Sequence, residues 1–185
     1  MILNQTLTFE DLKESQKNSF NGRRAQKVTI PVGTYFYKFT DWELFNLDND
    51  GNERVSPFWG TMGDLADILA YAQKTGKTLL ECVRARNAVL HNWNGLTCLV
   101  VIQTTQPIVG FAGDIGPQTE KGYAKEGQPY ARHFTTRLNF WGGASQVCLP
   151  HLDRQYINEI VPPNTVYIRD DVKAIQAFLK DFKLV

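Results

Sequence analysis

The stretch that most constrains the fold runs from Tyr156 to Ile168, where a glutamate stands inside an otherwise apolar, β-branched run. Side chains alternate between the two faces of a strand, so Ile157, Glu159 and Val161 are expected to share one face. The run is expected to stop at the turn sequence Pro162-Pro163-Asn164 and to resume as a second strand. A carboxylate held against apolar surface costs free energy unless it is partnered or useful, which makes Glu159 a candidate functional residue. The alternative is a glutamate at a sheet edge that points into water.

Chain length and composition predict one globular domain. With 185 residues, of which 43% are hydrophobic and 12% aromatic, the chain can bury one sizeable core. The formal charge is +1, from 20 basic and 19 acidic residues, so the totals carry no electrostatic signature of nucleic-acid or anionic-membrane binding. No apolar run approaches the ~18 residues of a membrane span, and no signal peptide is apparent. We therefore expect a cytoplasmic protein, or an effector that is secreted without a classical signal peptide.

The cysteines and histidines do not form a metal-binding pattern. Cys82, Cys98 and Cys148 are far apart and embedded in apolar runs, which predicts buried thiols in a reducing compartment. The histidines are equally dispersed, which favours surface positions over metal ligation. They are His91, His133 and His151. We expect no metal site.

The chain divides into an arm and a single domain. Residues 1–27 are polar, with sparse apolar positions, and are expected to pack loosely or to stay mobile. Residues 28–185 are expected to form the domain, with order beginning at Val28 and continuing through an aromatic strand at residues 33–39.

Helices are expected in the first half of this domain and at its end. Apolar residues recur at helical spacing between Thr61 and Gly76, and Thr78 with Glu81 reads as a capping box that opens a second helix. A last helix is expected to begin at Asp170 or Asp171.

Strands are expected between these helices. Their ranges are 96–103, 108–112, 135–140, 146–149 and 157–168. Glycines and prolines among charged residues predict a long irregular loop over residues 113–132. Because helices and strands are segregated along the chain, the predicted class is α+β.

Three short segments, taken in order, carry a resemblance to a known enzyme family. The first is an aromatic strand with a basic residue, the second a serine beside aromatics ahead of a helix, and the third a glutamate ahead of a proline pair. Their central residues are Lys38; Ser56, Phe58 and Trp59; and Glu159. Over residues 28–168 the set resembles the mono-ADP-ribosyltransferases, particularly the bacterial toxin-like branch with an Arg, Ser-Thr-Ser, Glu layout.

The resemblance implies a split β-sheet core with flanking helices, NAD as substrate and transfer of ADP-ribose to a macromolecular acceptor. It implies that Lys38 binds the dinucleotide, that Ser56 braces the pocket, that Phe58 or Trp59 stacks on nicotinamide, and that Glu159 is catalytic. Breaking the nicotinamide–ribose bond generates oxocarbenium character, which a carboxylate stabilises without a metal.

The chain departs from the family pattern at each motif. Lys38 stands where the family has arginine, which grips phosphate differently, and the second motif reads Ser-Pro-Phe. Ile157 stands two residues before the glutamate, where arginine-modifying members carry Glu or Gln. The neighbouring segment Arg154-Gln155-Tyr156 is expected to recognise the acceptor. An arginine substrate would meet Arg154 at like charge, so a non-arginine acceptor is expected.

Two further functions stay open on the sequence alone. One is a non-catalytic binding domain that recognises its partner through residues 113–132 and exposed aromatic side chains. The other is an NAD glycohydrolase or a nucleotide-processing enzyme on the same fold.

Overall fold

The computed structural model describes residues 2–41, 45–47, 53–90, 93–120, 138–167 and 172–181. The strands in this part of the chain are β1 (Gln26–Ile30), β2 (Tyr35–Thr40), β3 (Phe45–Leu47), β4 (Glu53–Val55), β5 (Phe58–Thr61), β6 (Cys98–Thr104), β7 (Ile108–Asp114), β8 (Gln118–Glu120), β9 (Leu138–Phe140), β10 (Ser145–Cys148) and β11 (Ile157–Tyr167). The helices are α1 (Glu14–Lys17), α2 (Met62–Thr75), α3 (Leu79–Asn87) and α4 (Val172–Asp181), with short 3₁₀ turns at Phe9–Asp11, Asn21–Arg23 and Arg154–Tyr156.

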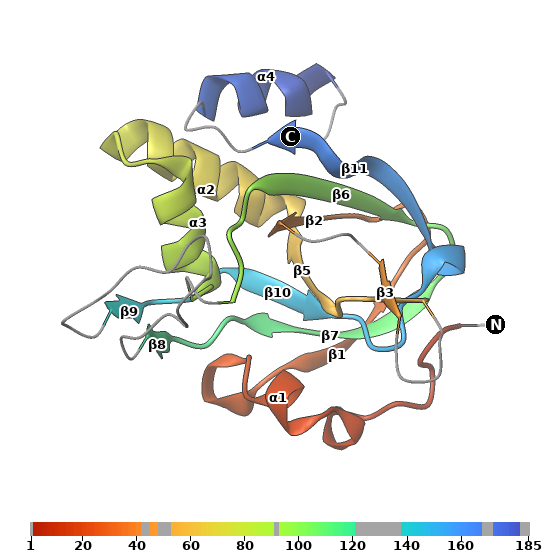
Figure 1. Cartoon of the computed structure of the whole chain (residues 1–185). Coiled ribbons are helices and arrows are strands. Elements are labelled where there is room, and N and C mark those ends of the chain that lie inside the picture. The colour runs from red at the N-terminus through yellow and green to blue at the C-terminus, as the bar shows by residue number, and fades with distance from the viewer. Residues whose placement is uncertain are drawn as a thin grey trace.

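A seven-stranded sheet forms the centre of the molecule, in the order β1-β7-β10-β5-β2-β6-β11. Each pair of neighbours in it is antiparallel. The pairs β3-β4 and β8-β9 form two small sheets beside it. Figure 1 shows the large sheet curled, with β6 and β11 at one side and β7 and β1 at the other. The predicted α+β class is confirmed, because an antiparallel sheet carries segregated helices.

Local sequence signals begin and end α2, and begin α3, as predicted. The Thr61 side chain accepts a hydrogen bond from the Asp64 amide at the start of α2, and Gly76 ends that helix with a left-handed backbone. Thr78 and Glu81 form a capping box at the start of α3. These caps fix where both helices meet the sheet.

The two faces of the curled sheet bury separate hydrophobic cores. The outer core joins β2, β6 and β11 to α2, α3 and α4 through Tyr37, Phe39, Leu65, Ile68, Leu69, Leu79, Val83, Leu99, Val101, Val161, Ile175 and Leu179. The inner core lies on the opposite face and gathers Ile30, Phe36, Val55, Trp59, Val100, Ile102, Ile108, Val147, Leu149, Leu152 and Ile157. We call these the outer face and the inner face of the sheet.

The N-terminal segment is an integral part of the fold, which corrects the expectation of a loose arm over residues 1–27. Leu12 and Phe20 are buried with Phe111 of β7 and Cys148 of β10. β1 begins at Gln26, within the predicted arm, and pairs with β7 along its length. The sparse apolar residues of this segment are enough to cover the part of the outer face that the helices leave open.

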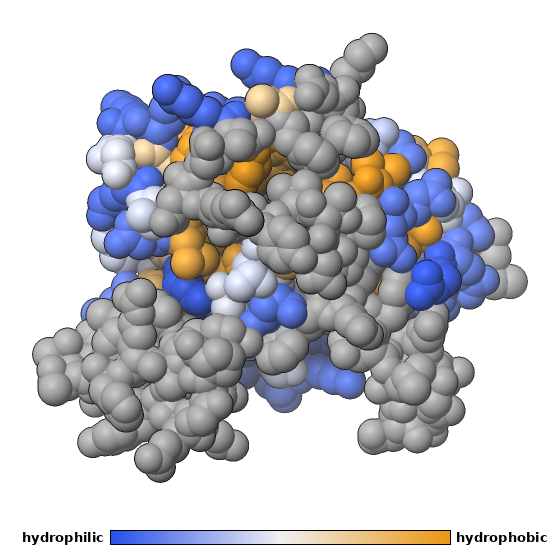
Figure 2. Space-filling model, turned by 45° about the horizontal axis from the view of Figure 1, so that its top comes forward, coloured by the Kyte–Doolittle hydropathy of each residue, from blue (hydrophilic) through white to orange (hydrophobic). Residues whose placement is uncertain are grey.

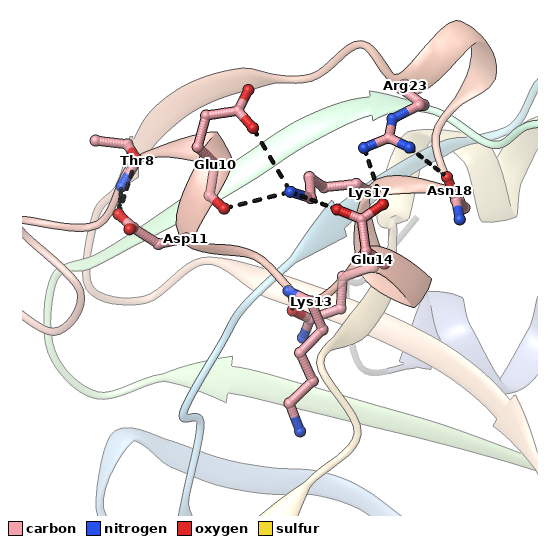
Figure 3. A network of polar contacts seen from close by, with 9 residues as sticks. Thr8, Glu10, Asp11, Lys13, Glu14, Lys17, Asn18 and Arg23 are labelled. Carbon is pink, nitrogen blue, oxygen red and sulfur yellow. Dashed lines mark hydrogen bonds and ion pairs between the residues drawn. The ribbon is translucent and has the colours of Figure 1, made fainter.

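Ion pairs hold this segment in shape. Lys17 is 7% exposed, and its Nζ atom lies 2.7 Å from Glu14 Oε1 and 3.5 Å from Glu10 Oε2. Arg23 contacts the other oxygen of Glu14 at 3.0 Å. Figure 3 shows the Lys17 ammonium between the carboxylates of Glu10 and Glu14, with Arg23 on the far side of Glu14. A lysine buried to this extent requires such partners.

β11 differs from the expected strand–turn–strand arrangement. It is one continuous strand from Ile157 to Tyr167, and its pairing with β6 shifts register between Glu159 and Val161 and again between Val161 and Val166. The first shift inserts an extra residue, so Val161 joins the outer core while Ile157 joins the inner core. The prediction that Glu159 and Val161 share a face is therefore wrong.

Other sequence predictions have mixed outcomes. Cys82, Cys98 and Cys148 are buried free thiols, as expected. The start of the expected loop 113–132 belongs to β7 and β8, and residues 121–137 lie outside the described part, as do His91, His133, Asp170 and Asp171. His151 is exposed.

The helices and the surface complete the description of the fold. No helix in the described residues is both long and apolar enough to cross a membrane. Figure 2 turns the α4 side of the molecule toward the viewer and shows hydrophobic surface near the middle, bordered by hydrophilic side chains. Surface of this mixed kind is common on globular proteins.

Candidate active site

The register of the sheet places Lys38 and Glu159 on the same face. Lys38 of β2 pairs with Val100 of β6, and Glu159 of β11 pairs with Ile102 of β6. Directly opposed residues in a sheet project to one side, and residues two apart on a strand do so as well. Val100 and Ile102 belong to the inner core, so the ammonium and the carboxylate both project from the inner face.

Glu159 lies at the edge of the sheet and is partly accessible. Its side chain is 26% exposed, and Oε1 lies 3.4 Å from Arg154 Nη1 in the turn that leads into β11. The Arg154 side chain is 61% exposed. Exposed ion pairs contribute about 0–1 kcal/mol, so Arg154 orients the carboxylate without locking it in place.

Lys38 has an unusual environment for a lysine. It is partly buried, and within the described chain it makes no hydrogen bond and no ion pair. Burial lowers the pKa of its ammonium to about 8. A cation that is desolvated and lacks an anion destabilises the fold, so a bound anion would compensate it.

Phe58 and Trp59 project to opposite sides of the sheet. Trp59 is 1% exposed within the inner core, and its Nε1 atom is buried without a hydrogen-bond partner. Phe58 packs on the outer side, against Leu12, Phe20 and their neighbours. Phe58 is partly accessible and Trp59 is buried, and the expected stacking of one of these rings on nicotinamide stays a prediction.

The remaining predicted residues differ in how far their side chains are buried. Ser56 is partly buried between β4 and β5. Gln155 is exposed and its side chain donates to Asp153 at 3.2 Å, while Tyr156 packs against the inner core. Arg154 is the member of the expected acceptor-recognition segment that contacts Glu159.

A small cavity near the end of α3 is lined by three of the predicted residues. Tyr37, Phe39 and Asn87 line it as well, which places it on the outer face of β2 and β5, whereas the side chains of Lys38 and Trp59 project to the inner face. The cavity has a volume of about 100 Å³. Lys38, Phe58 and Trp59 are among the residues that line it. Pockets for whole ligands measure about 300–1,000 Å³, so this cavity admits a single small group and not a dinucleotide.

Sequence reasoning missed Tyr37 and Asn87, which line the same cavity. Asn87 Nδ2 donates to the Tyr37 hydroxyl at 3.4 Å, and Asn87 Oδ1 is buried without a partner. Burial raises the pKa of the Tyr37 phenol. Asn87 is the last residue of α3 and carries no sequence signal. Gly60 does carry a sequence signal, namely that it is a glycine. A Cβ atom at this position would lie 2.3 Å from the Tyr37 ring.

A second concave surface lies between α2, α3 and β9, with Trp141 just after that strand. It has a volume of about 440 Å³ and an apolar floor that includes Ile68, Cys82 and Phe140. Tyr71 is 42% exposed and Trp141 is 68% exposed at its sides. Exposed aromatic side chains are enriched where proteins bind partners.

Metal chemistry has no preformed centre in the described residues, which hold no group of three His, Cys, Asp or Glu side chains able to share an ion. The inner face presents the ammonium of Lys38 and the carboxylate of Glu159 among apolar residues.

Comparison with known proteins assigns no family to the chain. No model of a protein family matches it, and no curated protein does so. Among solved structures, Tne2 in complex with Tni2 is similar over 79% of this chain and 95% of that chain, at 13% identity and a TM-score of 0.41. Rhs1-CT in complex with its cognate immunity protein RhsI1 is similar over 77% of this chain and 81% of that chain, at 12% identity and a TM-score of 0.43. Similarities at this level identify neither the family nor the function.

Proposed function

We propose that this protein cleaves NAD at the nicotinamide–ribose bond and passes ADP-ribose to a non-arginine acceptor or to water. The observation that carries the proposal is the placement of Lys38 and Glu159 on one face, on the two strands that flank β6. The two charged side chains are separated by one apolar strand. The cation matches the negative pyrophosphate of NAD, and the carboxylate matches the ribose, which becomes positive during the reaction.

Lys38 binds the pyrophosphate of the dinucleotide. Its ammonium has no anion in the described structure, so binding a phosphate adds a charge-assisted hydrogen bond without breaking an internal one. The same contact offsets the desolvation that lowers the lysine pKa. A lysine in this role acts as a point charge, whereas the arginine of the family makes paired contacts.

Glu159 supplies the negative charge for the reaction. As the nicotinamide leaves with the electrons of the glycosidic bond, positive charge develops on the ribose, and a fixed carboxylate stabilises it. The contact with Arg154 keeps this carboxylate oriented. An arginine acceptor would have to compete with Arg154 for Glu159, which favours a neutral acceptor group.

The test is release of nicotinamide from NAD, followed by chromatography, in the wild type, Glu159→Gln and Glu10→Gln. The Glu159 variant keeps the shape of the side chain and removes its charge, so a loss of ~10²-fold or more in turnover is expected. Glu10 has an 84% exposed side chain in the N-terminal segment, and its variant should match the wild type.

Two outcomes contradict the proposal. Unchanged turnover in Glu159→Gln removes Glu159 from the reaction. Efficient labelling of agmatine by radioactive NAD, lost in the same variant, shows that the acceptor is a guanidinium after all.

A second candidate function is a non-catalytic interaction domain. The exposed Tyr71 and Trp141 beside an apolar surface favour it, because such side chains anchor protein interfaces. This reading predicts that purified protein releases no nicotinamide.

A further inference from the structure

The concave surface between α2, α3 and β9 has the dimensions of a small-molecule site. Its volume of about 440 Å³ lies within the ~300–1,000 Å³ that is typical of ligand pockets. Buried side chains, Ile68 and Cys82 among them, close its floor, while the rings of Tyr71 and Trp141 at its sides are exposed. The surface therefore combines an apolar floor with two aromatic rings that reach solvent.

The exposed ring of Trp141 is carried by a backbone that is held in place. The amide of the next residue, Gly142, donates to the Ala85 carbonyl of α3 at 2.9 Å. Gly142 has a φ of 69°, and a Cβ atom there would collide with the Ile115 carbonyl oxygen, so this turn requires glycine. On the other side of Trp141, Phe140 is buried. An aromatic side chain on a fixed backbone is pre-organised, because ligand binding then costs little backbone freedom.

Arg86 places a positive charge beside this ring. It is partly buried and lines the same surface, and its Nη1 atom would lie 3.5 Å from a Cβ atom built on Gly143. The guanidinium therefore lies beside the turn that follows Trp141. Among the described residues the Arg86 side chain has no hydrogen-bond or ion-pair partner. A guanidinium is always charged and binds a carboxylate through two parallel hydrogen bonds, so a carboxylate ligand would supply the missing anion.

The other charges at this surface do not reverse that preference. Glu81 Oε2 already accepts hydrogen bonds from the Thr78 amide at 3.1 Å and from the Thr78 hydroxyl at 2.9 Å. Asp67 and Lys77 are exposed and opposite in sign, so water screens both and their charges offset each other. The least solvated of these unpaired charges, that of Arg86, then determines the charge of the ligand.

We propose that this surface binds a small aromatic carboxylate, whose ring packs against Tyr71 and Trp141 and whose carboxylate pairs with Arg86. Offset-stacked or edge-to-face contacts with the two exposed rings favour an aromatic ligand over an aliphatic one. The helices α2 and α3 cover the outer face of the sheet, whereas Lys38 and Glu159 project from the inner face. The ligand is therefore distinct from the substrate of the proposed reaction.

The experiment is calorimetric titration of the wild type with four probes. Indole-3-acetate carries the ring and the carboxylate, tryptamine replaces the carboxylate by an ammonium, and cyclohexylacetate keeps the carboxylate without an aromatic ring. The tripeptide Gly-Gly-Trp presents the same ring and a carboxylate at the end of a polypeptide. Indole-3-acetate is expected to bind ~10-fold more tightly than tryptamine or cyclohexylacetate, and at least as tightly as the tripeptide.

Matched variants assign the two contacts. Arg86→Met and Trp141→Ala are each expected to weaken indole-3-acetate binding ~10-fold. Arg24→Met makes the first change at an exposed arginine of the N-terminal segment. Trp93→Ala makes the second at a 52% exposed tryptophan that does not line this surface. Both control variants should match the wild type.

Several outcomes overturn the proposal. Tryptamine that binds as tightly as indole-3-acetate excludes the pairing with Arg86, and cyclohexylacetate that does so excludes the aromatic contact. Much tighter binding of the tripeptide shows that the surface takes the end of a polypeptide instead. Equal losses in a variant and its control, or no saturable binding of any probe, contradict the site. Should Arg86→Met fail to fold, the indole ¹⁵N–¹H resonance of Trp141 in the wild type decides: it must shift on adding indole-3-acetate while that of Trp93 stays in place.

These results are independent of the proposed reaction. Glu159→Gln should bind indole-3-acetate like the wild type, and Trp141→Ala should release nicotinamide from NAD like the wild type. Binding that depends on Arg86 and Trp141, without nicotinamide release by any protein, supports this site and rejects NAD cleavage. Nicotinamide release without such binding rejects this site alone.

Discussion

Lys38 is in an unusual state for a lysine, because it is partly buried and its pKa is lowered to about 8. A lysine normally keeps its ammonium in water or beside a carboxylate, and this one has neither a described partner nor full hydration. The chain thus carries a local instability on the face that bears Glu159. Such instability at one residue is common where a ligand later supplies the missing partner.

The lowered pKa of Lys38 predicts a pH dependence of stability. The ammonium has a pKa of about 8 in the folded protein and ~10.4 in the unfolded chain, so the unfolded state binds more protons between these values. The free energy of unfolding should therefore rise as pH increases from 8 to 10, and below pH 8 the full cost of charging the lysine remains. Urea unfolding of the wild type and Lys38→Met at pH 7, 8, 9 and 10 measures this change in the free energy of unfolding.

The comparison between the two proteins isolates this residue. Cys82, Cys148 and Tyr37 have raised pKa values and act in the opposite direction at high pH, but they are present in both proteins. Lys38→Met should be more stable than the wild type at pH 7, by ~1–3 kcal/mol, and the difference should shrink toward pH 10. A difference that stays constant with pH contradicts a desolvated ammonium.

Among the elements, the junction of β2 and β5 depends on one close approach. The Tyr37 ring crosses directly over Gly60, which is possible because glycine has no side chain. This crossing lies at the last paired position before the strands diverge. The close contact of Tyr37 with Gly60 therefore supports the pairing of β2 with β5 next to Lys38.

Gly60→Ala should destabilise the protein by ~1–3 kcal/mol, because its Cβ atom would lie 2.3 Å from Tyr37 Cε1 and 2.5 Å from Cζ. Gly63→Ala is the control: no atom lies within 4 Å of its Cβ, and it sits in α2, where alanine favours helix by ~0.5–1 kcal/mol. Urea unfolding of both variants should give opposite signs. A Gly60→Ala protein as stable as wild type would show that the tyrosine ring moves aside at no cost.

Sequence patterns predicted those elements whose signals are local. The caps at Thr61 and Thr78 involve side chains three residues apart, and both helices begin where expected. The register shift after Glu159 depends on β6, a strand distant in the sequence, and no local pattern encodes it. The alternation of side chains along a strand predicts that Phe58 and Trp59 point to opposite faces. It does not predict that Trp59 is the one that joins the inner core, because this depends on how β5 pairs within the sheet.

At the scale of the whole molecule, the curled sheet is covered on its outer face by two unrelated pieces of chain. The helices cover β2, β6 and β11, and the N-terminal segment covers β7 and β10. Composition alone suggested a mobile segment, because few of its residues are apolar. Leu12 and Phe20 are buried, and Leu7, Phe9 and Ala25 are partly buried against them, so the positions of these residues matter more than their number.

Phe20→Ala therefore tests whether this segment belongs to the fold. The side chain is 2% exposed, so the substitution should lower the free energy of unfolding by ~3–5 kcal/mol, whereas Val32→Ala, at a 59% exposed position, should change it by less than ~0.5 kcal/mol. Near-ultraviolet circular dichroism and hydrogen exchange of residues 9–24 should report the same transition as the rest of the protein. Loss of protection in this segment well before global unfolding would show an independent arm.

The strand order also determines when the candidate site comes into being during synthesis. β2 and β6 can pair once the ribosome has made the chain through Thr104, and Lys38 is then in its final strand. Glu159 is carried by β11, which is the last strand of the sheet in sequence and lies at its edge. A nascent chain therefore contains the lysine that we propose binds the dinucleotide long before the carboxylate is made, so the proposed reaction cannot begin until β11 has been made and has paired with β6.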